Sequence, residues 1–200
     1  SSRAPATGKN GMVASAHPYA TRAGLDVLRD GGNAIDAAIA VASTLNVAEP
    51  YMSGVGGIGL ALVYVAKEGR TRALNFSGHA PEAARPEMYD RFNIETGPLA
   101  PLVPGNVSGW LTMHEEYGSL PLKRVFRDAI RYAEEGVALT PWSAQLIEEN
   151  LERIDRFDSS QKAIVIDRAG MGRIPLEYWQ SRHEDPIPMR QAIFGPQGRE

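Results

Sequence analysis

Residues 33–47 read NAIDAAIAVASTLNV and include the longest strongly apolar stretch of the chain. A helix over residues 34–47 would be apolar on nearly every side, which predicts burial inside the domain. Asn33 is suited to cap this helix, and Asp36 falls at the third helical position, where a carboxylate meets exposed N–H groups. We therefore assign Asp36 to the cap, with a catalytic role as the less favoured alternative.

The segments around this helix mix helical and strand patterns. Upstream, a predicted strand at residues 11–15 precedes a helix that begins at Pro18 and ends before Gly31 and Gly32. Downstream, a β-hairpin is predicted at residues 60–65 and 71–76, followed by a Pro- and Gly-rich loop with a short helix near residues 86–91. Further helices are predicted at residues 107–117, 121–135 and 141–157, and a strand at residues 163–166. The fold class is α+β.

Composition excludes several classes of protein. The 200 residues carry a net charge of -3, and no window clusters Lys and Arg, so we expect no nucleic-acid partner. The apolar stretch is far shorter than the roughly 20 residues that cross a bilayer, so no membrane span is expected. There is no Cys, and no two His residues are close in sequence, so we predict no metal site and no cofactor.

Residues 54–59, GVGGIG, formally match the G-x-G-x-x-G dinucleotide fingerprint. The run follows a predicted helix and opens a strand, whereas the fingerprint follows a strand and opens a helix. We expect Gly54, Gly56 and Gly57 to be structural, by allowing positive φ and the close approach of two backbones. The alternative is that their bare N–H groups face a substrate carboxylate or an oxyanion.

Two histidines are candidates for function. His17 precedes a Pro at a strand-to-helix junction, where a capping or packing role is favoured over a functional one. His79 lies in the loop formed by residues 77–81, where its ring could meet a substrate or be a plain loop residue. The sequence contains no G-x-S-x-G, P-loop or H-E-x-x-H motif, so it does not reveal a nucleophile.

A series of segments between residues 3 and 160 follows the order and spacing of one known family. They are residues 11–15 with 17–18, 31–38, 49–50 with 53–57, 80–81, 103–109, 115–118, 133–136 and 140–141. In this series the chain resembles the γ-glutamyltranspeptidase family, whose members are autoprocessing N-terminal nucleophile (Ntn) hydrolases.

The resemblance implies a four-layer αββα fold, of which residues 1–200 form the N-terminal part of the large subunit. It implies a Thr nucleophile at the N-terminus of a small subunit, so no catalytic residue is expected in this chain, and the fragment alone is predicted to be inactive. The implied partners are the remainder of the large subunit, the small subunit from the same precursor, and a small-molecule amide substrate. The compartment stays open, with a periplasmic or secreted location favoured over a cytoplasmic one.

One departure from the family pattern concerns specificity. Members that act on glutamyl substrates carry Asp-x-Arg-Glu-x-Ala-Pro, in which the Arg holds the substrate α-carboxylate. Here Ser77 takes the Arg position, and transpeptidase-like amidohydrolases with Ser-Gly-Arg-Ala-Pro match better, which places His79 where their Arg stands. We therefore predict a γ-glutamyltranspeptidase-like amidohydrolase or acyltransferase with Ser77, Gly78 and His79 at the substrate. The alternatives are a true γ-glutamyl hydrolase or transpeptidase of glutathione metabolism, with an Arg from elsewhere, and an inactive binding relative.

Overall fold

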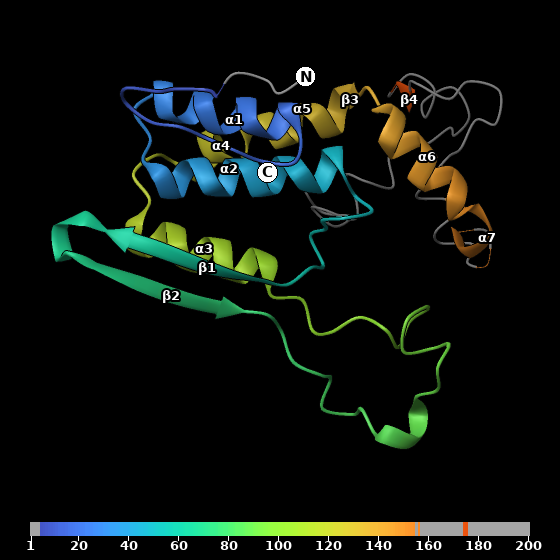
Figure 1. Ribbon diagram of the computed structural model, residues 1–200. Coiled ribbons are helices and arrows are strands. Elements are labelled where there is room, and N and C mark those ends of the chain that lie inside the picture. The colour runs from blue at the N-terminus through green and yellow to red at the C-terminus, as the bar shows by residue number, and fades with distance from the viewer. Residues whose placement is uncertain (1–4, 155, 157–173, 176–200) are drawn as a thin grey trace.

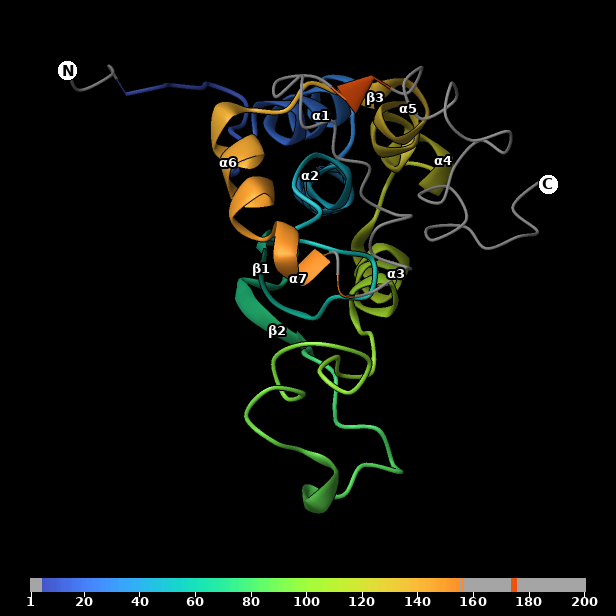
Figure 2. The ribbon, with the colours of Figure 1, turned by 90° about the vertical axis from the view of Figure 1, so that its right-hand side faces the viewer.

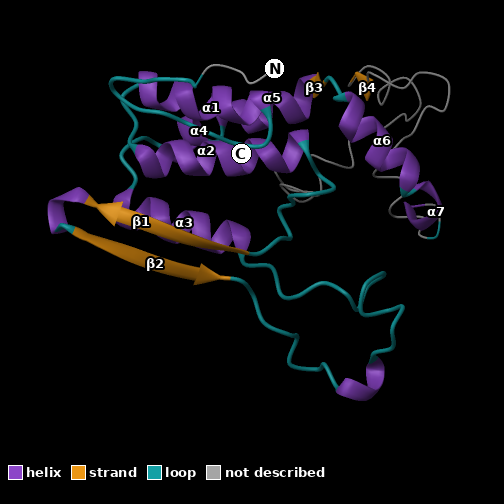
Figure 3. Cartoon of the chain, in the orientation of Figure 1, coloured by secondary structure: helices purple, strands orange, loops and turns teal. Residues whose placement is uncertain are grey.

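The computed structural model describes residues 5–154, 156, 174 and 175. Helix α2 (Ala34–Ala48) lies at the centre, with α1 (Pro18–Arg29) and α5 (Arg127–Glu135) on one side and α3 (Asn106–Tyr117) on the other (Figures 1 and 2). The β-hairpin lies beside α3, and both lie on the same side of α2 (Figures 2 and 3). The buried core is formed by helical residues, namely Val27, Ile35, Ala37, Ile39, Ala40, Trp110, Met113 and Val125.

The central helix is buried as predicted, because nearly every side of it meets another element. Ile39 is 1% exposed and Asp36 is 0% exposed. The Asn33 side chain accepts hydrogen bonds from the N–H groups of Ile35 and Asp36, and the Asp36 carboxylate accepts one from the Asn33 N–H. This reciprocal capping box fixes where α2 begins.

The predicted hairpin is confirmed. Strand β1 (Gly59–Val65) pairs antiparallel with β2 (Arg70–Phe76). The two strands are connected by the short 3₁₀ helix η1 (Ala66–Glu68) and by Gly69, which has a left-handed conformation. Because side chains alternate along a strand, one face packs against the core through Ala61, Val63, Leu74 and Phe76. The opposite face of β1 leaves Leu60, Leu62 and Tyr64 exposed to solvent.

A long loop joins β2 to α3 and extends away from the helices (Figures 1 and 2). Its regular structure is one 3₁₀ turn, η2 (Pro86–Met88), where a short helix was predicted. Val103 donates its N–H to the carbonyl of His79 at 3.0 Å, which brings the two ends of the loop together. The loop therefore starts and finishes next to the end of the hairpin.

Three predicted elements differ in the structure. Residues 11–15 form no strand, because they pair with no other strand in the described part of the chain, and Val13 packs instead against α1 at Gly24. The helix predicted at residues 121–135 is divided into α4 (Leu122–Val125) and α5 at Phe126, whose ψ of -6° tightens the turn.

The third difference is near the end of the described chain. The helix predicted from residue 141 begins there, capped by Thr140, but is divided into α6 (Pro141–Glu149) and α7 (Leu151–Ile154) at Asn150. The short strand β3 (Gly136–Val137) pairs with β4 (Ile174–Pro175). The strand predicted at residues 163–166 lies outside the described residues. No helix among the described residues is both long and apolar enough to cross a membrane.

Candidate functional site

Three separate segments of the chain meet where β1 begins, β2 ends and α3 begins. We call them the glycine turn (residues 54–57), the histidine segment (residues 77–79) and the linking segment (residues 103–106). The sequence singled out the first two as separate candidates. The structure brings them together through the third.

The glycine turn is closed by its own backbone and held by Asn106. The N–H of Gly57 donates to the carbonyl of Gly54 at 2.9 Å, and the Asn106 side-chain amide donates to the same carbonyl at 2.8 Å. The carbonyl of Gly57 accepts two further bonds, from the N–H groups of Gly105 and Asn106, each at 3.0 Å. Both ends of the turn are thus bonded to the start of α3.

The predicted structural reasons for the three glycines hold only in part. Gly54, Gly56 and Gly57 do not have positive φ, so that part of the expectation is wrong: the turn uses conformations open to other residues. Close approach is confirmed at Gly57, where an added Cβ would lie 2.6 Å from the Asn106 amide nitrogen. A Cβ on Gly54 would meet nothing within 4 Å, and one on Gly56 only Pro104, at 4.0 Å.

Gly54 and Gly56 therefore border open space. The N–H groups of Val55 and Gly56 donate to no atom in the described part of the chain. Two unpaired N–H groups beside space that no side chain fills are suited to an oxygen acceptor. The geometry therefore fits the alternative role, in which backbone N–H groups of the turn face a substrate.

The histidine segment follows directly from β2. The Ser77 N–H donates to the Asn75 side-chain oxygen at 2.9 Å, which turns the chain at the end of the strand. Gly78 has a φ of 77°, and an added Cβ would overlap the Val103 carbonyl, so glycine is required here. Ser77 is half-buried, whereas Gly78 and His79 are exposed. The His79 ring is thus available to another molecule.

The linking segment has a role that sequence reasoning missed. The family resemblance includes residues 103–106 but implies no function for them. No local pattern indicated this role, because the Asn106 side chain bonds to Gly54, 52 positions away, and not to the backbone of its own helix.

His17 and Asp36 are buried and structural. His17 is 4% exposed, and its Nδ1 accepts the Tyr19 N–H at 3.2 Å, which confirms the capping role. Burial lowers the pKa of His17, and the charge of Glu49 offsets only part of this effect. Burial alone would raise the pKa of Asp36, but hydrogen bonds from Ser119, Asn33 and Leu120 outweigh it, and that pKa lies below its ordinary value.

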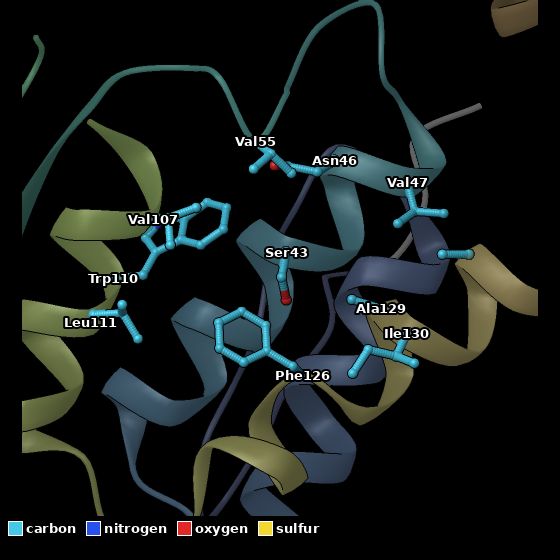
Figure 4. Close-up of a pocket in the computed structure, with 11 residues that line it drawn as sticks. Ser43, Asn46, Val47, Val55, Val107, Trp110, Leu111, Phe126, Ala129 and Ile130 are labelled. Carbon is cyan, nitrogen blue, oxygen red and sulfur yellow. The ribbon is translucent and has the colours of Figure 1, made fainter. Parts of the chain in front are cut away.

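A cavity of about 210 Å³ lies between α2, α3 and α5 (Figure 4). Its apolar lining includes Val55 of the glycine turn, Val107, Trp110 and Leu111 of α3, and Phe126 and Ile130. The cavity thus reaches the inner side of the glycine turn. Among the described residues, no three His, Asp or Glu side chains are grouped so as to hold a metal ion.

The family model for gamma-glutamyltranspeptidase matches residues 20–177. The chain belongs to the γ-glutamyltranspeptidase family. Among curated members, it is 38% identical to the glutathione hydrolase proenzyme of Bacillus subtilis (strain 168) over 157 residues, which cover 74% of this chain and 27% of that protein. It is 39% identical to the acylase ACY 1 proenzyme of Pseudomonas sp. (strain V22), with 96% of this chain and 37% of the relative covered.

Solved structures of the γ-glutamyltranspeptidase family agree. The Helicobacter pylori γ-glutamyltranspeptidase superposes with a TM-score of 0.79 and 35% identity, covering 82% of this chain and 49% of that one. This confirms the predicted α+β class and the Ntn-hydrolase fold. The chain spans between 27% and 37% of the length of these two curated relatives.

Proposed function

We propose that the whole protein is an Ntn amidohydrolase or acyltransferase of the γ-glutamyltranspeptidase family. In this proposal residues 1–200 belong to the N-terminal part of its large subunit, and a Thr nucleophile begins the small subunit. The Thr hydroxyl attacks the amide carbonyl while the α-amine of the same residue takes the proton. The amine product leaves, and water or a second amine then accepts the acyl group. Both curated relatives are named proenzymes, which supports cleavage of a precursor.

The observation that carries the specificity is Ser77 at the position of the carboxylate-binding Arg. A neutral hydroxyl lacks the charge and the two parallel donors that hold a carboxylate. We therefore favour an acyl group without a glutamyl α-carboxylate at this point. His79, exposed two residues further on, would bind the polar end of such a substrate. The acylase relative, matched over 96% of this chain, supports this choice.

The open face of the hairpin supports the proposal that the remainder of the large subunit and the small subunit pack on this chain. Leu60, Leu62 and Tyr64 are 73%, 79% and 67% exposed on one side of β1. Adjacent apolar side chains of this size on one surface are typical of an interface. We propose that the rest of the precursor covers this face.

True γ-glutamyl hydrolysis is the second candidate function, favoured by the 38% identity to a glutathione hydrolase proenzyme. It needs an Arg from elsewhere to take the α-carboxylate. A catalytically inactive relative that binds the same ligands is the third reading. An exported location, which the family resemblance favours, belongs to the proposal as well, and fractionation of cells tests it.

The test is a comparison of substrates on the full-length protein. We expect self-cleavage into two subunits, hydrolysis of amides whose acyl group carries no carboxylate at the glutamyl position, and weak activity on γ-glutamyl anilides. Ser77→Arg should raise activity on the γ-glutamyl anilide relative to an amide whose acyl group carries no carboxylate. Robust glutamyl transfer to dipeptides by the unaltered protein would overturn the proposed specificity. If the protein cleaves neither itself nor any of these amides, the third alternative, a catalytically inactive relative, is favoured.

A further inference from the structure

We infer that Asn106 is a positioning residue that holds the glycine turn and the histidine segment in a fixed relation to each other. The inference rests on the proposed function, since both segments are placed at the substrate there. It assigns a role to a residue that contacts neither His79 nor the open side of the turn.

The first step concerns the hydrogen bonds from Asn106 to the glycine turn. Asn106 is 7% exposed, and it donates its side-chain amide to Gly54 and its backbone N–H to Gly57. The side-chain group at this point must be a donor, because the Gly54 carbonyl is an acceptor that already binds the Gly57 N–H. An Asp at position 106 would place an oxygen against that carbonyl, with the same shape and no donor. The space is also tight, since an added Cβ on Gly57 would lie 2.6 Å from the amide nitrogen.

The second step is the contact with the histidine segment. Gly105, the neighbour of Asn106, packs so closely on β2 that an added Cβ would overlap the Phe76 carbonyl and lie 3.5 Å from the Gly78 nitrogen. Three residues before Asn106, Val103 donates its N–H to the His79 carbonyl. The linking segment thus touches both candidate segments, and a shift of its last residues, where α3 begins, would move both.

The third step is what this arrangement presents to a ligand. The glycine turn offers the free N–H groups of Val55 and Gly56 beside open space, and the histidine segment offers an exposed imidazole. Together they suit a substrate with an oxygen acceptor, either a carboxylate or an amide carbonyl, at the turn. The distance between the glycine turn and the His79 imidazole is set by the linking segment and not by either candidate segment alone.

The experiment compares Asn106→Asp with Asn93→Asp in the full-length protein. Asn93 is a matched control, because its side-chain amide also donates to a backbone carbonyl, that of Met88 at 2.9 Å, away from the three segments. We measure hydrogen exchange at the N–H groups of Gly57, Gly105 and Val103, and kcat and KM on the acyl amide that the full-length protein hydrolyses fastest.

For Asn106→Asp we expect exchange at all three amides to rise about tenfold, the equivalent of one lost hydrogen bond. We also expect kcat/KM to fall about 10- to 100-fold, mainly through KM, because the binding groups are misplaced. Asn93→Asp should change neither. If exchange rises at Gly57 but not at Val103, the two segments are not coupled and the inference is wrong.

Two further outcomes separate this inference from the proposed function. A protein that hydrolyses no amide contradicts the proposed function, while the exchange pattern still tests the coupling. If Asn106→Asp lowers the melting temperature but leaves KM unchanged, Asn106 is merely structural and the positioning role is overturned. Should Asn106→Asp not fold, Asn106→Ser keeps a shorter donor, and it is expected to give the same pattern with smaller changes; no change in exchange or KM would overturn the inference.

Discussion

The Asp36 carboxylate accepts hydrogen bonds from both the backbone N–H and the hydroxyl of Ser119, a residue 83 positions further along the chain. The N–H lies 3.1 and 3.2 Å from the two carboxylate oxygens, and the hydroxyl lies 2.5 Å from one of them. Because the same carboxylate also caps α2, one fully buried side chain joins the start of the central helix to the turn between α3 and α4.

Asp36→Asn should lower the free energy of unfolding by about 2–4 kcal/mol, since it leaves buried donors facing an amide NH₂ group. Chemical denaturation measures this change. Asp26→Asn is the control, because Asp26 forms surface ion pairs with Arg22 and Arg29 and should cost no more than about 1 kcal/mol. Equal effects of the two variants would show that the link to Ser119 contributes little.

Acid should reduce stability in two steps. The folded-state pKa of His17 lies below its ordinary 6.5, so the unfolded chain takes up a proton first, and stability falls as the pH drops below that value. The pKa of Asp36 lies below 3.8, so its contribution is present above that value and is lost as the pH falls further. Urea denaturation between about pH 8 and pH 3 measures both steps. His17→Asn, which can still cap α1, should remove the first step only.

Alanine at two glycines should have opposite consequences. Gly57→Ala forces a Cβ against the Asn106 amide and should cost about 1–3 kcal/mol of stability. Gly56→Ala has open space and no positive φ, so stability should change by no more than about 0.5 kcal/mol. Thermal or urea unfolding distinguishes the two. A reversed order would mean that the glycine turn is arranged differently from the structure described.

The exposed His79 ring should affect binding more than turnover. His79→Ala in the full-length protein is expected to raise KM for an anionic amide substrate about tenfold, the size of a lost hydrogen bond to a charged group, with self-cleavage intact. Arg91→Ala is the control, since Arg91 is exposed in the same loop and outside the three segments. Unchanged kinetics for His79→Ala would reduce His79 to a plain loop residue.

Leu62 tests whether the open face of the hairpin is covered in the whole protein. Although it is 79% exposed here, Leu62→Ala should destabilise the full-length protein by about 2–5 kcal/mol if the rest of the precursor packs on it. Lys67→Ala, in the exposed turn between the two strands and outside this face, is the control and should change stability by no more than about 0.5 kcal/mol. An effect of Leu62→Ala below about 0.5 kcal/mol would indicate that this face stays in water.

Local patterns alone determined much of this protein. The central helix with its cap at Asn33, the hairpin and the α+β class follow from residues close together in sequence, because capping and side-chain periodicity act over a few positions. The series of short segments was enough to indicate the family. The substitution of Ser77 for the expected Arg was likewise visible, since it concerns the identity of one residue in a fixed pattern.

Other features depend on what lies across space. Residues 11–15 form no strand because pairing needs a neighbour, and the helix at residues 121–135 is divided at Phe126, whose ring lies 6.5 Å from Trp110. The hydrogen bond between Asn106 and Gly54 joins residues 52 positions apart, and the one between Ser119 and Asp36 joins residues 83 positions apart. Such hydrogen bonds exist only once the chain has folded and buried the groups that form them, so only the tertiary structure decided that the two candidate segments belong to one site.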